Sequence, residues 1–429
     1  MANSLEVATL ITNEVARIAH NASAFLGRMN QDYESSWRGQ YPAGSTVRAR
    51  LPVQFTVRSG ATANVQDITD SYVPIVVQPE VGIDFAISDF DLTLAVQNDG
   101  SISKGFRTRF LKPAGLKLAS AIDTAVGVLV KNNTANFIGT PGTGMTSIAD
   151  VLNAKVPAQN EGVPSMENMF AALSPVANAN VVAGLATLFN DQSKISQQYK
   201  SGIVADSLGL EFVMSQNIPS HTVGPLGGTP VTAAANQGLI NVGATDNPNA
   251  QTTTLLTQGW TAAAAARVAA GDVITIAGVF AINPENKQST GVLRNFVVTA
   301  AASSDAGGLA SLIIAPAIIA ATGTGTSAYA NVTARPAGGA AITVLTGGAG
   351  LSFGQNVIWH RDAITFVSPD MEIPGGMDMA YGVSAPDTGG MSLRFVRGFD
   401  IINNRRISRF DVLYGAAVTR MGWVVRRTG

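Results

Sequence analysis

Two stretches of strictly alternating hydrophobicity near the N-terminus constrain the fold of this chain more than any other feature. From residue 46 to 58 apolar side chains occupy every second position, and most of the positions between them are polar. The apolar set is Val47, Ala49, Leu51, Val53, Phe55 and Val57, and the polar set includes Arg48, Arg50, Gln54, Thr56 and Arg58. A period of two predicts a strand with one buried and one solvated face. A second alternating stretch, 73–87, follows the polar residues 59–71, so the pair predicts an extended β-hairpin arm over residues 41–90. An arm of this kind is too thin to hold its own core and must lie on another surface.

Two segments have the period of an α-helix. Residues 4–26 predict an amphipathic helix, because apolar residues recur at steps of three and four and Asn3 with Glu6 resembles an N-cap signal. Residues 101–133 predict a helix of about 45 Å that serves as a spine. Pro113 should kink this helix or start its regular part, because proline lacks the amide that a helix interior requires. The predicted buried face of the spine consists of Phe106, Phe110, Ala114, Leu118, Ile122, Val126, Leu129 and Val130.

The character of the chain changes twice after the spine. Residues 147–221 alternate short helices and strands, with a buried strand at 210–214 and a polar helix or loop at 191–200. Between residues 221 and 346 there are only eight charged residues, and short apolar runs at 273–279, 293–298 and 309–315 are separated by turn-forming residues. This pattern predicts an all-β barrel or sandwich domain inserted over residues 222–345. Afterwards, 357–359 and 364–367 predict returning strands, and 393–399 with 407–414 predict a second hairpin around Asn403 and Asn404. The predicted fold class is α+β.

The composition indicates a chain that buries surface against other copies. Only 13% of the 429 residues are charged, against about 25% in an average globular domain. An extracellular β-rich protein is the alternative that composition alone leaves open. The net charge of −1 demands no polyanionic partner. Cysteine is absent, which excludes disulfides, zinc–thiolate sites and thiol nucleophiles. Glu6, Glu14 and Arg17 interrupt any signal-peptide core, and no membrane-spanning helix is expected, the nearest apolar run being 309–321.

The order of these elements resembles the major capsid proteins of tailed bacteriophages. Segments similar to the family's axial-domain pattern are Leu173-Ser-Pro, Tyr199-Lys-Ser-Gly202, Gly209-Leu-Glu-Phe212 and Ser215-Gln-Asn-Ile-Pro219. A further resemblance, to the podovirus subgroup whose coat carries an inserted telokin-like (immunoglobulin-like) domain, is carried by three segments. They are Gly271-Asp-Val-Ile-Thr-Ile-Ala-Gly-Val279, Asn356-Val-Ile-Trp-His-Arg-Asp-Ala-Ile-Thr-Phe-Val-Ser368 and Phe410-Asp-Val-Leu-Tyr-Gly-Ala-Ala-Val-Thr-Arg420.

The resemblance implies a division of the chain into six parts. They are an N-terminal helical arm (1–40), the extended β-hairpin arm (41–90), a peripheral domain with the spine helix (91–140), the first part of an axial domain (141–221), the inserted telokin-like domain (222–345) and the return strands with a C-terminal hairpin (346–429).

The resemblance also implies a function. The expected protein is structural and non-enzymatic, without cofactor or metal, and assembles into an icosahedral shell of pentamers and hexamers. Its expected partners are copies of itself, a scaffolding protein, a portal protein and, by non-specific contact at most, packaged double-stranded DNA. Its expected place is the virion capsid, assembled in the host cytoplasm, with no membrane. Some relatives crosslink an arm lysine to a neighbour's asparagine, but the first lysine here is Lys104, outside the arm. The shell should therefore be held non-covalently. A cellular nanocompartment shell of the same fold, or an extracellular β-rich adhesin or surface-layer protein, is the alternative.

Motifs of catalytic chemistry are incomplete in this chain. His360-Arg361-Asp362 begins like a kinase catalytic loop, but Ala363 and Val367 stand where leucine and asparagine are required. The glycine-rich segment 139–144 lacks the Gly-Lys-Ser/Thr ending of a phosphate loop, which favours a plain turn. The three histidines are far apart in sequence. The cluster Asp84, Asp89 and Asp91 favours pairing with arginines over metal binding.

The arginines are the informative charges. From residue 394 to the end there are eight arginines, two acids and no lysine. The guanidinium group suits planar, multidentate pairing. Three interpretations are open: a solvated strand face, ion pairs between subunits, and contact with DNA phosphates without base readout. The candidate contacts between subunits are Arg48, Arg50, Arg58, Arg394, Arg397, Arg405, Arg406 and Arg409.

Overall fold

A computed structural model describes most of the chain. The described residues are 3–31, 46–55, 57, 60–61, 71–78, 80–87, 105, 107–145, 148–164, 167–185, 209–240, 251–320, 328–373, 379–385, 391–400, 402 and 405–429. The chain divides into two compact units. Unit 1 comprises Met1–Ala49, Pro74–Val126 and Ile364–Ala417, and unit 2 comprises Arg50–Val73, Gly127–Ala363 and Val418–Gly429.

A four-stranded sheet forms the centre of unit 1. Its order is β20 (Met379–Ala385), β21 (Met391–Asp400), β22 (Arg405–Leu413) and β3 (Glu80–Ile87). The register from Arg394↔Asp411 to Asp400↔Arg405 confirms the predicted C-terminal hairpin. β22 then pairs along its whole length with β3, from Arg406↔Ile87 to Leu413↔Glu80. The second alternating stretch of the N-terminal region therefore joins a sheet with the C-terminal hairpin.

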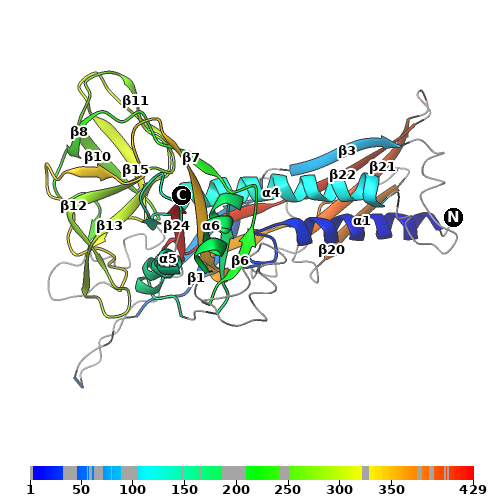
Figure 1. Ribbon diagram of the computed structural model, residues 1–429, viewed down its shortest axis with the longest axis horizontal. Helices are drawn as coiled ribbons and strands as arrows, with labels where there is room; N and C mark the ends of the chain where they lie inside the picture. Colours follow the sequence, from blue (N-terminus) through cyan, green and yellow to red (C-terminus); the bar gives the residue numbers. More distant parts are fainter. Residues whose placement is uncertain are drawn as a thin grey trace. The chain divides into compact units, whose positions relative to one another are not determined.

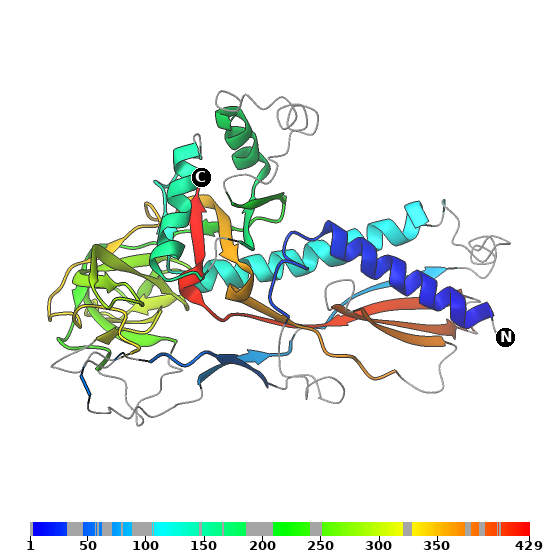
Figure 2. The ribbon, with the colours of Figure 1, turned by 90° about the horizontal axis from the view of Figure 1, so that it is seen from below.

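Two helices accompany this sheet. Helix α1 (Asn3–Ala22) contacts β20 and β21, and the first turns of α4 (Lys112–Asn133) lie beside α1 (Figure 2). The helices touch at Gly115, where an added Cβ would lie 2.7 Å from the Ile18 side chain and 3.2 Å from the Val15 carbonyl oxygen. Glycine at position 115 thus permits an approach of the two helices that a side chain would prevent.

A second contact lies just beyond the end of α1. There the buried carboxylate of Asp123 in α4 accepts hydrogen bonds from the Ser23 hydroxyl and, at 2.8 Å, from the Ala24 amide.

The spine prediction is correct in its centre and wrong at its start. Pro113 lies in the first turn of α4, as predicted, and a π-helical turn, Arg107–Leu111, precedes it. Phe110, assigned to the buried face, is exposed. The reason is that the π-turn changes the periodicity, so the α-helical spacing cannot be extended backwards through it. The predicted residues that are buried are Ala114, Leu118, Ile122, Val126 and Val130.

The arm pairs as predicted near its base but is shorter than expected. β1 (Thr46–Leu51) pairs with β2 (Ser71–Val76), and Val47, Ala49 and Ile75 belong to a buried cluster of unit 1. The strand predicted to run to residue 58 ends at Leu51. Pro52 follows immediately, and proline cannot donate the ladder hydrogen bond that would continue a strand.

A mixed sheet forms the body of unit 2. Its order is β4 (Phe137–Ile138), β24 (Val424–Thr428), β18 (Ser352–His360), β5 (Met169–Leu173) and β6 (Glu211–Met214), and β7 (Ser220–Thr222) pairs with the start of β18. Helices α5 (Ile148–Asn160) and α6 (Pro175–Leu185) confirm the predicted alternation of helices and strands. The predicted polar segment 191–200 lies outside the described residues. Trp359 of β18 is the largest fully buried side chain in the described part of the chain.

The strands between β7 and β18 form a β barrel, the term used below for residues 228–344. Its main sheet has the order β17 (Ile342–Val344), β12 (Val273–Ile282), β13 (Ser289–Val298), β15 (Ala310–Ala315), β10 (Thr253–Trp260) and β8 (Gly228–Thr232). The Thr232 amide donates to the Ala340 carbonyl at 2.9 Å and Val231 bridges Ala341, so the edges β8 and β17 meet and the sheet closes. Short pairs, β11 (Ala265–Val268) with β14 (Ala302–Ser304) and β9 (Leu239–Ile240) with β16 (Ile319–Ala320), complete it (Figure 1).

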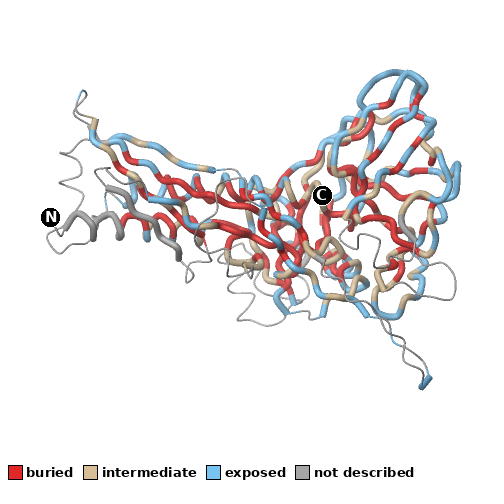
Figure 3. The backbone as a smooth tube through the Cα atoms, turned by 180° about the vertical axis from the view of Figure 1, so that it is seen from behind, coloured by how far each residue is buried: buried red, intermediate tan, exposed pale blue. Residues whose placement is uncertain are grey.

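The barrel surrounds a hydrophobic core of its own. Fully buried members include Leu255, Phe296, Leu312 and Val332, whereas much of its loop surface is exposed (Figure 3). The three predicted apolar runs coincide with β12, β13 and β15. A closed sheet leaves no unpaired strand edge that could pair with another chain. The barrel therefore needs few charged residues to prevent such pairing.

One helical segment of the described chain, Arg107–Asn133, is long and apolar enough to span a bilayer by length and composition. Half of its most apolar window is buried. The expected nearest candidate, 309–321, instead supplies β15 and β16.

Candidate subunit-contact surfaces

The arm presents two of the predicted arginines outward. Arg48 and Arg50 are exposed on β1, and Val47 and Ala49, which alternate with them, are buried, so the predicted alternation is confirmed there. Arg58 lies outside the described residues.

Beyond Pro52 the predicted alternation of buried and exposed residues does not continue. Phe55 and Val57, predicted to be buried, keep 62% and 99% of their surface exposed. Both line an open groove of about 760 Å³ in unit 2. The opposite walls are the barrel loop 284–288, residues 328–329 and the segment 419–423. We call this the arm groove.

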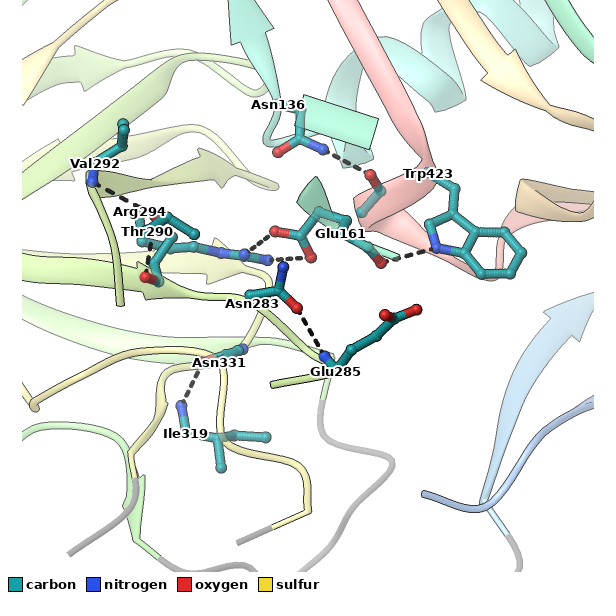
Figure 4. A network of polar contacts seen from close by, with 12 residues as sticks. Asn136, Glu161, Asn283, Glu285, Thr290, Val292, Arg294, Ile319, Asn331 and Trp423 are labelled. Atoms are coloured by element: carbon teal, nitrogen blue, oxygen red, sulfur yellow. Dashed lines mark hydrogen bonds and ion pairs between the residues drawn. The ribbon is translucent and has the colours of Figure 1, made fainter. Parts of the chain in front are cut away.

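A partly buried polar network includes Glu161 and Trp423, which line the arm groove (Figure 4). Glu161, at the end of α5, forms an ion pair with buried Arg294 of β13, whose Nη2 donates to Oε2 at 3.4 Å. The Trp423 indole donates to the Glu161 carbonyl oxygen at 3.2 Å. The Arg420 guanidinium lies 4.0 Å from the Trp423 ring centroid, within cation–π range. Trp423 thus gives the groove an aromatic surface, and its contacts with Glu161 and Arg420 hold the ring in place.

A second charged cluster lies on the four-stranded sheet of unit 1. Buried Asp411 accepts hydrogen bonds from Arg394 Nη2, at 2.8 Å, and from Arg409 Nε. Glu80 of the neighbouring strand accepts from Arg409 Nη2 at 2.9 Å and from Arg394 Nη2 at 3.3 Å. The hydrogen bond to Asp411 is the largest effect on Arg409 and raises its pKa. Asp84, 3.7 Å from Arg409, pairs with an arginine as predicted.

The remaining predicted arginines differ in position. Arg397 is buried within the chain, as are Arg426 and Arg427, so a solvated strand face does not describe them. Arg405 and Arg406 belong to β22, but their side chains lie outside the described part. The cluster of Arg394 and Arg409 satisfies its charges within one chain, which the sequence pattern did not reveal.

The segments that resemble catalytic motifs lie at a strand end and in turns. His360 ends β18 and Arg361–Ala363 form a single 3-10 turn. Residues 139–144 form a turn, as expected. Within the described ranges no three His, Cys, Asp or Glu side chains gather as a metal site would require.

Sequence reasoning missed the buried polar residues that join the barrel to the body of unit 2. Asp272 is fully buried and binds His221 Nε2 at 2.8 Å and the Thr346 hydroxyl at 3.1 Å through Oδ1. Its Oδ2 accepts from the amides of Gly224, at 3.1 Å, and Ala269, at 2.7 Å. Asp272 and Arg294 could have been suspected from one signal, because isolated charges in an apolar segment require partners.

Comparison with known families decides the identity. The family described as "P22 coat protein - gene protein 5" matches residues 1–424, almost the whole chain. The chain belongs to this family of coat proteins. It is therefore a phage major capsid protein, a structural component that assembles with copies of itself into the shell of the virion. The family assignment favours this function over the nanocompartment and adhesin alternatives.

Solved structures are similar at low sequence identity. A structure titled "Mycobacterium phage Che8" is 13% identical to this coat protein, with coverage of 94% of this chain and 89% of that chain and a TM-score of 0.42. The "Capsid of Ralstonia phage GP4" is 6% identical, with coverage of 94% and 86% and a TM-score of 0.43. The "CUS-3 coat protein I-domain" is 25% identical over 28% of this chain and 96% of its own, with a TM-score of 0.21. Among curated proteins none matches the sequence.

Proposed function

We propose that this coat protein forms an icosahedral shell of pentamers and hexamers around double-stranded DNA, with a scaffolding protein and a portal protein as assembly partners. The observation that carries the proposal is the exposed apolar end of the arm. Phe55 and Val57 follow a strand pattern that elsewhere in the arm is buried, yet in the single chain they face solvent beside the arm groove.

Covering these two side chains supplies a driving force for assembly. Burial of one large apolar side chain contributes roughly 1.5–3 kcal/mol. A contact of that size is weak by itself, because association has its own entropic cost. A closed symmetric shell repeats each contact in every subunit, so weak contacts add up to a stable container and still allow misplaced subunits to dissociate.

The outward-facing arginines complete the proposed interface. Arg48 and Arg50 lie on the exposed face of the arm, next to the exposed apolar end. We assign them, with Arg58, to rim contacts with neighbouring copies, where charge pairing sets partner orientation more than affinity. Arg394, Arg405, Arg406 and Arg409 stay candidates for the same role, and the intrachain pairs of Arg394 and Arg409 would have to be shared with a neighbour. Arg397 is buried within the chain and would have to become exposed on assembly to join them.

The double substitution Phe55→Asp/Val57→Asp tests the proposal. We expect shell yield in the presence of scaffolding protein to fall at least tenfold, because a carboxylate in a desolvated contact has a cost above the ~1.4 kcal/mol that corresponds to tenfold in an equilibrium constant. Sedimentation of assembly reactions measures the yield. Thermal unfolding of the monomer should be unchanged, since both side chains are already exposed.

The matched control keeps the apolar character of the arm. Phe55→Leu should assemble at close to the original yield. Normal shell yield from the double aspartate variant would remove the arm end from the interface.

We further propose that residues 222–345 form an inserted telokin-like domain that stiffens the subunit. Support comes from the separate core of the barrel and from the pairing of β7 with β18, which brings the two ends of the segment together. Expressed alone, this segment should unfold in one cooperative transition on heating, followed by circular dichroism. A spectrum typical of a disordered chain would show that the proposed domain boundaries are wrong.

A further inference from the structure

A cationic cleft in unit 1 has no role in the proposed interface. It lies between α1 and the turn that leads into α4 and encloses about 520 Å³. Its polar lining is Arg17, Asn21, Arg107, Thr108 and Lys112, and Ile18, Ala22 and Leu116 complete it. We call this the α1–α4 cleft.

One carboxylate, that of Glu14, forms ion pairs with two guanidinium groups that line the cleft. Glu14 Oε1 lies 2.8 Å from Arg17 Nη2 and 2.5 Å from Arg107 Nε. Burial alone would raise the pKa of Glu14, but the hydrogen bonds and charges of Arg17 and Arg107 lower it below its usual value. Glu14 is therefore ionised at neutral pH, and against Arg17, Arg107 and Lys112 it leaves a net charge of about +2 in the cleft.

The two chain segments that line the cleft carry further positive charge. Within the described side chains of 11–31 and 107–122, Glu14 is the one carboxylate, and Arg109 and Lys117 are exposed on the same segment as Arg107 and Lys112. The whole chain has a net charge of −1. These two segments are therefore strongly positive in a chain that is close to neutral overall, which suits contact with a polyanion.

We propose that the α1–α4 cleft binds the phosphate backbone of the packaged double-stranded DNA. The inference rests on the proposed function, in which the shell encloses DNA. The π-helical turn Arg107–Leu111 and the first turns of α4 together extend over at most about 15 Å, taking 1.5 Å per residue. This length corresponds to at most about four phosphates of one strand at ~3.4 Å each. Guanidinium groups bind phosphate oxygens in bidentate geometry. Base readout is not part of the proposal, so binding is independent of sequence.

The salt dependence of binding provides the quantitative test. Each phosphate contact contributes about 0.9 to the slope of log affinity against log salt, or roughly eightfold in affinity at ~0.1 M salt. The full-length monomer should bind a short fluorescein-labelled duplex, measured by anisotropy, and lose affinity steeply as salt rises. Arg107→Gln/Lys112→Gln should reduce the slope by about 2 and the affinity at least tenfold. Two duplexes of unrelated sequence should bind equally.

The matched control removes a positive charge elsewhere. Arg361 is exposed in unit 2, and Arg361→Gln should leave affinity and slope unchanged. Equal binding by the double glutamine variant and the parent protein would overturn the proposal. Binding of polyglutamate without binding of DNA would also overturn it and identify the cleft as a protein-docking site. Shell assembly by the double glutamine variant separates this inference from the proposed function. If the variant forms shells and binds DNA as the parent protein does, this inference fails while the proposed function stands.

Discussion

Replacement of Asp272 by alanine is expected to lower the free energy of unfolding of unit 2 by about 3–5 kcal/mol, the usual cost of removing one partner from a buried charged network. The carboxylate is fully buried and accepts four hydrogen bonds. These bonds come from both connections of the barrel, His221 and Gly224 before it and Thr346 after it, and from Ala269 within it. Their loss would leave three buried donors and one partly buried donor without an acceptor.

One fully buried cation, Arg426, and one half-buried cation, Lys131, make the loss larger. Arg426 of β24 is fully buried and donates from Nη2 to the Gly271 carbonyl oxygen at 2.8 Å. Burial lowers the pKa of Arg426 to about 9, and the charge of Asp272 opposes this effect. Burial also lowers the pKa of Lys131, which Asp272 likewise opposes. Without Asp272 these positive charges would lack their buried counter-charge.

Urea unfolding of the full chain, followed by tryptophan fluorescence, measures the effect of Asp272→Ala. Asp272→Asn is the matched variant, because it keeps the shape and one acceptor oxygen while it removes the charge, so we expect an intermediate loss. A loss below about 1 kcal/mol for the alanine variant, the typical net value of a single neutral hydrogen bond, would show that the network does not hold the barrel in place.

Removal of Glu161 should have the second largest effect. Glu161→Ala leaves Arg294, nearly fully buried on β13, without its ion-pair partner, which lines the arm groove. We expect a loss of about 3 kcal/mol, at the lower end of the range for a broken buried pair because Glu161 is partly exposed.

A double-mutant cycle separates the pair from the general effect of substitution. Arg294→Met removes the charge and keeps an unbranched apolar side chain. The double variant Glu161→Ala/Arg294→Met should be more stable than Glu161→Ala alone, because the unpaired charge is gone. Additive losses in the cycle would contradict direct coupling of the two side chains.

Sequence patterns predicted this fold best where one face of an element is buried within the chain. The period of two in β1, the central turns of α4 and the C-terminal hairpin all follow the burial of alternate or helically spaced residues. The prediction failed at Phe55 and Phe110. At Phe55 the pattern of a buried face continues, but Pro52 ends the strand, and in the proposed shell a neighbouring copy covers this face.

Long-range polar pairing could not be predicted from the sequence. Glu161 and Arg294 are 133 positions apart, and His221 and Asp272 are 51 positions apart. Periodicity identifies the face on which a residue lies, but it contains no information on which distant charge will meet it. For the same reason the arginines near the C-terminus were grouped by type, whereas the structure separates buried Arg397 from the cluster around Asp411.

Electron cryo-microscopy of the purified chain, mixed with its scaffolding protein, tests the central claim most directly. The expected result is a closed icosahedral particle in which a neighbouring copy covers Phe55 and Val57. Particles that leave both side chains facing solvent, or protein that stays monomeric at high concentration with scaffold present, would contradict it.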